Sequence, residues 1–345
     1  MDTTPRTSAH TTTGGAATAH PGPEAATRRD ATDPSAPLHV VLGAGPVGTT
    51  LAQQLVARGL RVRTITRSGT GLDHPLAERM TADVADAAAL RAATEGASVI
   101  YNAVNPPYHR WPELWPPMHR AAMAAATAHG AVLVLMDNLY SYGPTGGRPL
   151  SPDLPQAATD GKGRVRAEMA DELLAAHRAG TLRATIARAS DFVGPLVTGS
   201  HLGDRVVPRV LAGKGVQLLG SLDQPHSFAY MPDVARTLVA LGSDERAWGR
   251  VWHVPSAPAV TQREAVQRLA QLAGTSVKIG TLSPALLRVA GLVVPMLREL
   301  RGTAYQFEEP FVVDAAETEQ AFGITATPLD EALAATLAWY RTRAA

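Results

Sequence analysis

The hydrophobic positions of this chain follow two patterns that alternate along its first half. Short apolar runs typical of buried strands alternate with longer segments whose apolar residues have helical spacing. The strand-like runs are 40–42, 62–66, 97–104, 132–136 and 182–190, with a weaker one just before Asp83, and the helix-like segments include 85–93, 118–129 and 164–178. Strands that alternate with helices form a parallel sheet covered on both faces. We therefore expect an α/β fold with a doubly wound parallel sheet.

The pattern changes after Gly194, where proline and glycine become frequent and the predicted helices shorten. We expect residues 195–345 to form mainly a smaller C-terminal α/β substrate lobe, with segments at about 228–254 returning to the first domain, 37–194. Residues 1–36 are rich in Thr, Ala, Pro and Gly and carry almost no large apolar side chain. Such a segment cannot offset its ordering entropy, so we predict a disordered tail.

A glycine-rich turn follows the first strand-like run and precedes a helical segment. Gly43, Gly45 and Gly48 form a G-x-G-x-x-G pattern that also contains Pro46 and Val47. The first glycine permits a tight turn, the second lets backbone N–H groups approach a pyrophosphate, and the third lets the helix pack closely. The positive end of that helix then faces the phosphates. This context predicts a Rossmann-type dinucleotide site, and a turn that binds nothing is the alternative.

The end of the second strand-like run indicates which dinucleotide binds. NAD-binding domains usually carry an acidic residue there, which accepts a hydrogen bond from the ribose 2′-hydroxyl. Here Arg67 takes that place, with Arg63 nearby. An arginine pairs with a 2′-phosphate, which a carboxylate would repel. We therefore predict NADP(H) as the cofactor in preference to NAD(H).

Composition excludes several classes of function. The formal net charge is +1, which gives no electrostatic basis for nucleic-acid binding. The chain has no cysteine, and its histidines show no metal-ligand spacing, so we predict no metal site. The apolar stretch 285–300 is interrupted by Arg288 and Pro295, so we expect no membrane span, a helix on the membrane surface being the alternative. These features favour a cytoplasmic protein, a monomer or homodimer, that acts on a small molecule.

Five segments in order resemble motifs of the extended short-chain dehydrogenase/reductase superfamily, in its NAD-dependent epimerase/dehydratase group. They are Asp83-Val84, YNAVNPP at 101–107, LMDNLYSYGP at 135–144, RASDFVGP at 188–195 and SFAYMPDVA at 227–235, and the resemblance covers roughly 38–337. The resemblance implies that Asp83 and Val84 contact the adenine. It also implies that Ala103, Val104 and Asn105 run under the nicotinamide ribose.

The chain departs from this family where the chemistry is carried out. The family uses a Ser or Thr to orient the substrate oxygen, and a Tyr-x-x-x-Lys pair to transfer a proton and hold the ribose. Counting from the YGP segment, Asn138 falls at the Ser/Thr position, and the Tyr position falls near Lys162 or Gly163. The family's lysine falls near Arg166 or Ala167, and no tyrosine occurs between 142 and 230. Asn138 can orient a carbonyl but cannot act as an acid.

Two residues are candidates for the missing acid. Lys162 lies at or next to the expected position between two glycines, and partial desolvation beside Arg164 and Arg166 would lower its pKa. It could equally bind the cofactor or substrate, or be an exposed lysine before a helix. Tyr140 follows the strand end and could face the nicotinamide region.

Residues 105–117 form a proline-rich segment that contains two tryptophans. We predict a stiffened loop in which Tyr108 and Trp111 offer flat apolar area to a ring-bearing substrate, with His109 as a proton donor or a surface residue. His226 lies where the family binds its substrate.

Together these features predict an NAD(P)-dependent oxidoreductase that reduces a carbonyl, enone or imine of a small organic substrate. One alternative is an epimerase or dehydratase that acts on a sugar-like substrate. A non-catalytic NADP(H)-binding sensor is the other.

Overall fold

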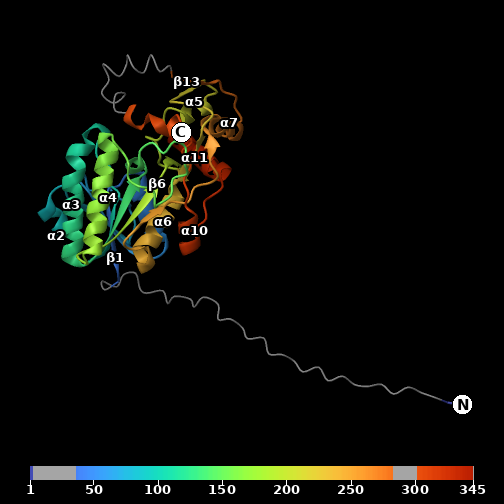
Figure 1. The fold of residues 1–345 in the computed structure, drawn as a ribbon. Helices are drawn as coiled ribbons and strands as arrows, with labels where there is room; N and C mark the ends of the chain where they lie inside the picture. Colours follow the sequence, from blue (N-terminus) through green and yellow to red (C-terminus); the bar gives the residue numbers. More distant parts are fainter. Residues whose placement is uncertain (3–35, 283–300, 345) are drawn as a thin grey trace.

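A seven-stranded parallel sheet forms the centre of the molecule in the computed structural model, which describes residues 1–2, 36–282 and 301–344 (Figure 1). The strand order is β11-β6-β5-β4-β1-β2-β3. The strands are β1 (Leu38–Leu42), β2 (Arg61–Thr66), β3 (Ala77–Thr81), β4 (Ala97–Asn102), β5 (Val132–Asn138), β6 (Arg183–Ala189) and β11 (Val251–His253). This order reverses direction between β1 and β4, as in other doubly wound sheets. The predicted fold class is confirmed.

Helices cover both faces of the sheet. α2 (Ala87–Ala93), α3 (Trp111–His129) and α4 (Gly161–Arg178) pack on one face, while α1 (Pro46–Ala57) and α6 (Met231–Ser243) pack on the other (Figure 1). Alternate residues of β5 enter the two cores: Leu133 and Leu135 join the first, and Val132, Val134 and Met136 join the second. Burial on both faces explains why the strands lack a polar alternation.

α3 begins at Trp111, seven residues before the predicted start at 118, so the expected loop 105–117 is wrong in its second half. Tyr108–Arg110 form a 3₁₀ turn that leads directly into the helix. Pro112 lies in the first turn, where its missing N–H costs nothing, whereas Pro116 and Pro117 lie inside the helix. Burial of Trp111 and Trp115 against the sheet offsets the hydrogen bonds that these prolines remove.

A third hydrophobic core lies beyond the carboxyl edge of the sheet (Figure 1). It is formed mainly by α5 (Val207–Leu211), α7 (Gln262–Ala273), α11 (Leu329–Ala344) and the paired strands β8 (Val216–Leu218) and β13 (Ile279–Thr281). α7 has well-defined ends, because Thr261 and Glu264 form a capping box at its start and Gly274 adopts a left-handed conformation at its end.

The remaining elements of the described chain are short. They are β7 (Asp191–Val193), β9 (Pro225–His226), β10 (Phe228–Tyr230), β12 (Val260–Thr261), α10 (Ala316–Phe322) and the 3₁₀ turns η1 (Tyr108–Arg110), η2 (Tyr140–Tyr142), η3 (Glu245–Ala247) and η4 (Arg301–Phe307). β10 pairs with β7 in parallel, and β11 then joins the sheet beside β6.

Two expectations concern segments outside the described residues. They are the tail, apart from residues 1–2 and 36, and the apolar stretch 285–300. Across the described parts of the chain, no helix combines the length and apolar character needed to cross a lipid bilayer.

Candidate active site

A pocket of about 690 Å³ opens at the carboxyl ends of the sheet strands. Residues that follow five strands contribute to its walls, among them Gly43, Arg67, Ala103, Asn138 and Ser190. This is the edge at which doubly wound sheets bind their ligands. The glycine turn and the residues after β2, including Arg67, line one region, whereas aromatic side chains from η1, α3 and η2 line another. The two regions therefore suit two different parts of a bound molecule.

The glycine turn has the geometry of a pyrophosphate cradle. Gly43 has a φ of 98°, and its carbonyl oxygen would lie 2.0 Å from a Cβ atom at Gly48. α1 starts directly after Gly45, and no side chain caps its first N–H groups. Nothing lies within 4 Å of a Cβ position at Gly45, so this end of the helix is open to the pocket. Pro46 and Val47 also line it, and the turn therefore fits a dinucleotide phosphate.

The region next to the turn fits the adenosine end of a dinucleotide. Asp83 and Val84 line the pocket, and one carboxylate oxygen of Asp83 accepts the N–H of Ala85 at 2.9 Å. Arg67 is exposed at the end of β2, and the described residues give it no ion pair. Arg63 is unavailable, because it binds Glu78 at 2.7 Å.

The loop after β4 lies against the glycine turn. A Cβ atom at Gly43 would approach the carbonyl oxygen of Ala103 to 3.1 Å, so the two segments are in close contact. Ala103, Val104 and Asn105 line the pocket between the phosphate region and the aromatic region. This placement is compatible with the role that the family resemblance gives these residues.

Four aromatic rings form one wall of the pocket: Tyr108, Trp111, Trp115 and Tyr140. The ring of Trp111 lies 5.1 Å from Tyr108 and stacks on Tyr140 at 5.9 Å, measured between centroids. Its indole N–H donates to the carbonyl oxygen of Pro106 at 3.1 Å. Trp111 is therefore both a core residue of α3 and a wall of the pocket. His109, by contrast, is exposed and lines no part of it.

The end of β5 brings Asn138 and Tyr140 into the pocket. The Asn138 side-chain oxygen accepts the backbone N–H of Tyr140 at 3.0 Å, which stabilises the turn η2. Burial, followed by the neighbouring Tyr108 and Asp191, raises the pKa of Tyr140 well above its ordinary value. Tyr140 is consequently a weaker acid here than an exposed tyrosine.

Lys162 lies in the first turn of α4, not in a free loop. The Asp160 side chain caps this helix by accepting the backbone N–H groups of Lys162 and Gly163 at 2.9 and 3.0 Å. The Lys162 side chain is buried, and its Nζ lies 4.3 Å from the centre of the Tyr108 ring. Lys162 is not part of the pocket wall, although it contacts a ring that is. A Cβ atom at Gly163 would lie 2.6 Å from the Tyr140 carbonyl oxygen, so glycine allows α4 to approach η2.

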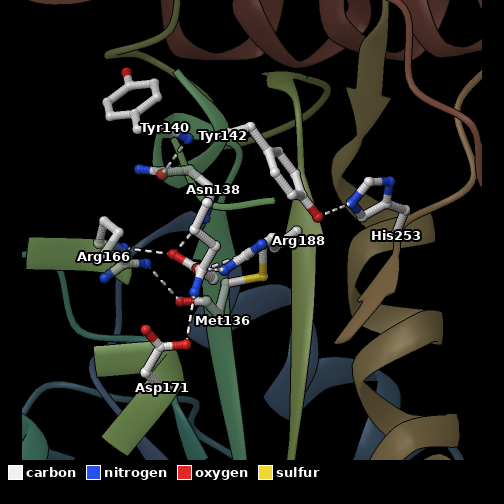
Figure 2. Close-up of polar contacts among 10 residues, drawn as sticks. Met136, Asn138, Tyr140, Tyr142, Arg166, Asp171, Arg188 and His253 are labelled. Atoms are coloured by element: carbon white, nitrogen blue, oxygen red, sulfur yellow. Dashed lines mark hydrogen bonds and ion pairs between the residues drawn. The ribbon is translucent and has the colours of Figure 1, made fainter. Parts of the chain in front are cut away.

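A buried ion cluster supports the pocket from below Asn138 (Figure 2). The Asp137 carboxylate binds the Arg166 Nε at 2.5 Å and the Arg188 Nε at 2.9 Å, and all three side chains are almost fully buried. Arg166 also donates to the carbonyl oxygen of Met136 at 3.0 Å. Its Nη1 has no hydrogen-bond partner among the described residues, and the side chain lines the pocket. Arg166 is thus held in place, and its Nη1 is buried beside the pocket without a hydrogen-bond partner among the described residues.

Aromatic rings pack against both guanidinium groups. Arg166 lies over Trp115 at 4.4 Å, and Arg188 lies over Tyr142 at 4.7 Å. The Tyr142 hydroxyl contacts the His253 Nε2 at 2.8 Å, which links β11 to the cluster (Figure 2). Two arginines and one carboxylate leave a positive charge in this region, and the rings help to stabilise it. Tyr142 is buried in this cluster and does not line the pocket.

His226 lies behind the pocket wall and not in it. It is buried in β9, and its Nε2 lies 2.9 Å from the Asp191 carboxylate. Asp191 does line the pocket.

Sequence reasoning missed Asp191 and Asp137. A charged residue directly after the apolar run VLVLM was a signal for Asp137, because an unpaired carboxylate at a buried strand end is costly. No local pattern signalled the contact of Asp191 with a residue 35 positions away. Among the described residues, no group of three or more His, Asp or Glu side chains could hold a metal ion.

This fold and pocket define a dinucleotide-dependent enzyme of the short-chain dehydrogenase type. The model of the NAD dependent epimerase/dehydratase family matches residues 39–254, and the chain belongs to that family. A search of curated protein sequences finds no match.

Solved structures share the fold across most of the chain. dTDP-glucose 4,6-dehydratase from Bacillus anthracis, in complex with NAD, is similar with a TM-score of 0.73 and 16% identity over 89% of this chain and 97% of that one. UDP-glucose 4-epimerase from Thermotoga maritima, with UDP-glucose, is similar with a TM-score of 0.74 and 14% identity, over 89% of this chain and 100% of that one. An enzyme from Bordetella bronchiseptica in complex with NAD+ is similar with a TM-score of 0.69 and 20% identity, over 89% of this chain and 98% of that one.

Proposed function

We propose that this protein uses a nicotinamide dinucleotide to oxidise and re-reduce an oxygen-bearing carbon of a small, sugar-like substrate, as an epimerase or dehydratase. The observation that carries the proposal is one pocket that has a glycine turn suited to phosphate at one end and an aromatic region at the other. Family membership and the similar dehydratase and epimerase structures support this chemistry over a simple reductase. The bound dinucleotide would supply hydride acceptance and donation.

A net reduction of a carbonyl, enone or imine is the second candidate. The aromatic wall formed by Tyr108, Trp111 and Tyr140 favours it, because flat apolar area suits a ring-bearing organic substrate better than a fully hydroxylated one. The two candidates share the pocket and differ in whether the cofactor is consumed.

We propose NADP(H) as the preferred dinucleotide. A small hollow beside the glycine turn is lined by Ala44, Thr66, Arg67, Ser68 and Thr70. Its arginine and hydroxyl groups are the donors that a 2′-phosphate needs. Arg67 lines this hollow, and none of the described residues forms an ion pair that would hold its side chain elsewhere.

The roles of the site residues follow from their positions. Asn138 would orient the substrate oxygen, and Tyr140 and Tyr108 would hold the substrate against the nicotinamide region. Arg166, with its unpartnered Nη1, would bind a hydroxyl of the dinucleotide or the substrate. Lys162 would act through Tyr108, whose ring its ammonium group contacts, unless ligand binding exposes the lysine.

The test begins with dinucleotide binding to the purified protein, followed by a substrate panel of nucleotide sugars, free sugars, ketones, enones and imines. An epimerase or dehydratase converts its substrate while the absorbance of reduced nicotinamide stays constant, and mass spectrometry detects an isomer or loss of water. A reductase consumes reduced nicotinamide in proportion to product. Tight dinucleotide binding without conversion across the panel would favour the non-catalytic sensor.

A further inference from the structure

The pocket contains few groups that could exchange a proton with a substrate. Among the described residues, the titratable side chains that line its aromatic region are Tyr108, Tyr140 and Asp191, together with Asp137 and Arg166 of the buried cluster. Burial raises the pKa of both tyrosines, and Asp137 is fully engaged with two arginines. Asp191 is therefore the carboxylate that remains accessible, with 24% of its side chain exposed.

His226 makes Asp191 unusual. The His226 Nδ1 lies 3.1 Å from the backbone carbonyl oxygen of Gln306, and its Nε2 lies 2.9 Å from the Asp191 Oδ2. A carbonyl oxygen can only accept, so Nδ1 carries a hydrogen. A hydrogen bond between Nε2 and a carboxylate then requires a second proton between these two atoms. The geometry points to one proton held jointly by His226 and Asp191.

The surroundings fix the ring of His226 and affect the ionisation of Asp191. The imidazole stacks on Phe307 and Phe311, with centroids at 5.0 and 5.2 Å. The ring of His201 also stacks on Phe307, with centroids 4.1 Å apart. Burial lowers the pKa of His201 to about 4. Burial of Asp191 opposes its ionisation, but the hydrogen bond and charge of His226, then His201, outweigh it and lower the pKa of Asp191. The contact with His226 therefore favours the ionised form of Asp191.

We propose that Asp191 and His226 form the acid–base pair of this pocket, with Asp191 in contact with the substrate and His226 as a positioning residue that stores the proton. The inference rests on the proposed function, because it needs a substrate oxygen in the aromatic region. When a substrate carbonyl is reduced, its carbon gains a hydride from the bound dinucleotide and its oxygen takes the shared proton through the Asp191 carboxyl group. His226 is left neutral, with its hydrogen on Nδ1, and regains a proton from water.

Oxidation of a substrate hydroxyl is the reverse, and it needs the pair without its shared proton. The hydroxyl proton passes to the Asp191–His226 pair while the hydride leaves the same carbon. Reduction should therefore slow, and oxidation should accelerate, as the pH rises through the ionisation of the pair. The titratable groups that face Asp191 are His226, His201, Tyr108 and Tyr140.

Nitrogen NMR of the histidine rings tests the shared proton without any substrate. In the dinucleotide complex at neutral pH, we expect both ring nitrogens of His226 to be protonated, and only one in the Asp191→Asn variant. His201→Asn is the matched control, because it removes a buried histidine of the same aromatic stack and should leave the His226 signals doubly protonated. A singly protonated His226 in the unaltered protein would overturn the proposal.

Kinetics test the transfer step. Asp191→Asn should bind the dinucleotide within about twofold of the unaltered protein, yet lose about a hundredfold or more in turnover and lose the pH dependence. An Asp191→Asn variant with unchanged turnover and pH profile would also overturn the proposal. If the unaltered protein binds the dinucleotide and shows the doubly protonated His226 but converts no substrate, the proposed function fails while the shared proton stands.

Discussion

At the scale of single residues, Arg67 is expected to select the dinucleotide. Its guanidinium group is exposed beside the hollow next to the glycine turn, where a 2′-phosphate would lie. We expect Arg67→Ala to weaken NADPH binding by about tenfold to a hundredfold, because a charge-assisted contact is lost. NADH binding should change little. Titration by nicotinamide fluorescence measures both constants, and Arg58→Ala, an exposed arginine at the end of α1, is the matched control. Equal losses for NADH and NADPH would contradict the assignment.

Asp137 is the residue whose loss should damage the fold most. It neutralises two buried arginines, so its removal leaves their charges without a partner. We expect Asp137→Asn to lower the free energy of unfolding by about 3 kcal/mol or more. An exposed pair such as Arg120 and Glu172 should contribute less than about 1 kcal/mol. Urea denaturation of Asp137→Asn and Arg120→Gln compares the two, and similar losses would show that the buried cluster has no special role.

At the scale of elements, we expect the two glycines at the start of α1 to have different roles: Gly48 is needed for folding and Gly45 for binding. A Cβ atom at Gly48 would lie 2.0 Å from the Gly43 carbonyl oxygen, whereas one at Gly45 meets nothing within 4 Å. We expect Gly48→Ala to destabilise the protein by about 2 kcal/mol or more, because α1 must move away from β1. Gly45→Ala should fold normally and bind the dinucleotide at least about tenfold more weakly, since its methyl group enters the phosphate space.

Thermal unfolding with and without dinucleotide distinguishes these two effects. Gly45→Ala should retain the melting temperature of the free protein but lose the upward shift that a bound dinucleotide produces. Gly48→Ala should melt at a lower temperature even without dinucleotide. A Gly45→Ala variant that binds as tightly as the unaltered protein would remove the turn from the binding site.

Most elements could be predicted because their signals are local. The apolar run of β5 and the capping box of α7 specify their own conformations. α3 was predicted seven residues too short, because the prolines of 105–117 favoured a stiffened loop. Burial of Trp111 and Trp115 against the sheet decided otherwise, and that contact is not visible in a local pattern.

At the scale of the whole molecule, buried histidines should make stability depend on pH. Burial lowers the pKa of His39, His119, His201 and His253 to about 4. In the unfolded chain they titrate near about 6.5. Between these two values the unfolded state binds more protons, so the free energy of unfolding falls as the pH drops. The contribution of these groups is complete above about pH 6.5 and is lost by about pH 4.

Melting curves between neutral pH and pH about 4 test this expectation. The melting temperature should fall steeply over this window, and His119→Gln should fall less steeply because one such group has been removed. His74→Gln alters an exposed histidine and should follow the unaltered protein. A flat melting temperature across the window would show that the buried histidines take up protons in the folded state.

Local sequence patterns were sufficient to predict the doubly wound sheet, the glycine turn and the residues after β2, β4 and β5 that line the pocket. Period, turn chemistry and strand ends are properties of neighbouring residues, so they can be predicted without the fold. Only the tertiary structure decided which side chains face the substrate region. Lys162 was predicted as a candidate acid of the site and lies buried in α4 against Tyr108, whereas Asp191 and His226 meet across 35 residues of sequence. Contacts between distant segments depend on how the hydrophobic cores pack against one another, and no local pattern encodes that packing.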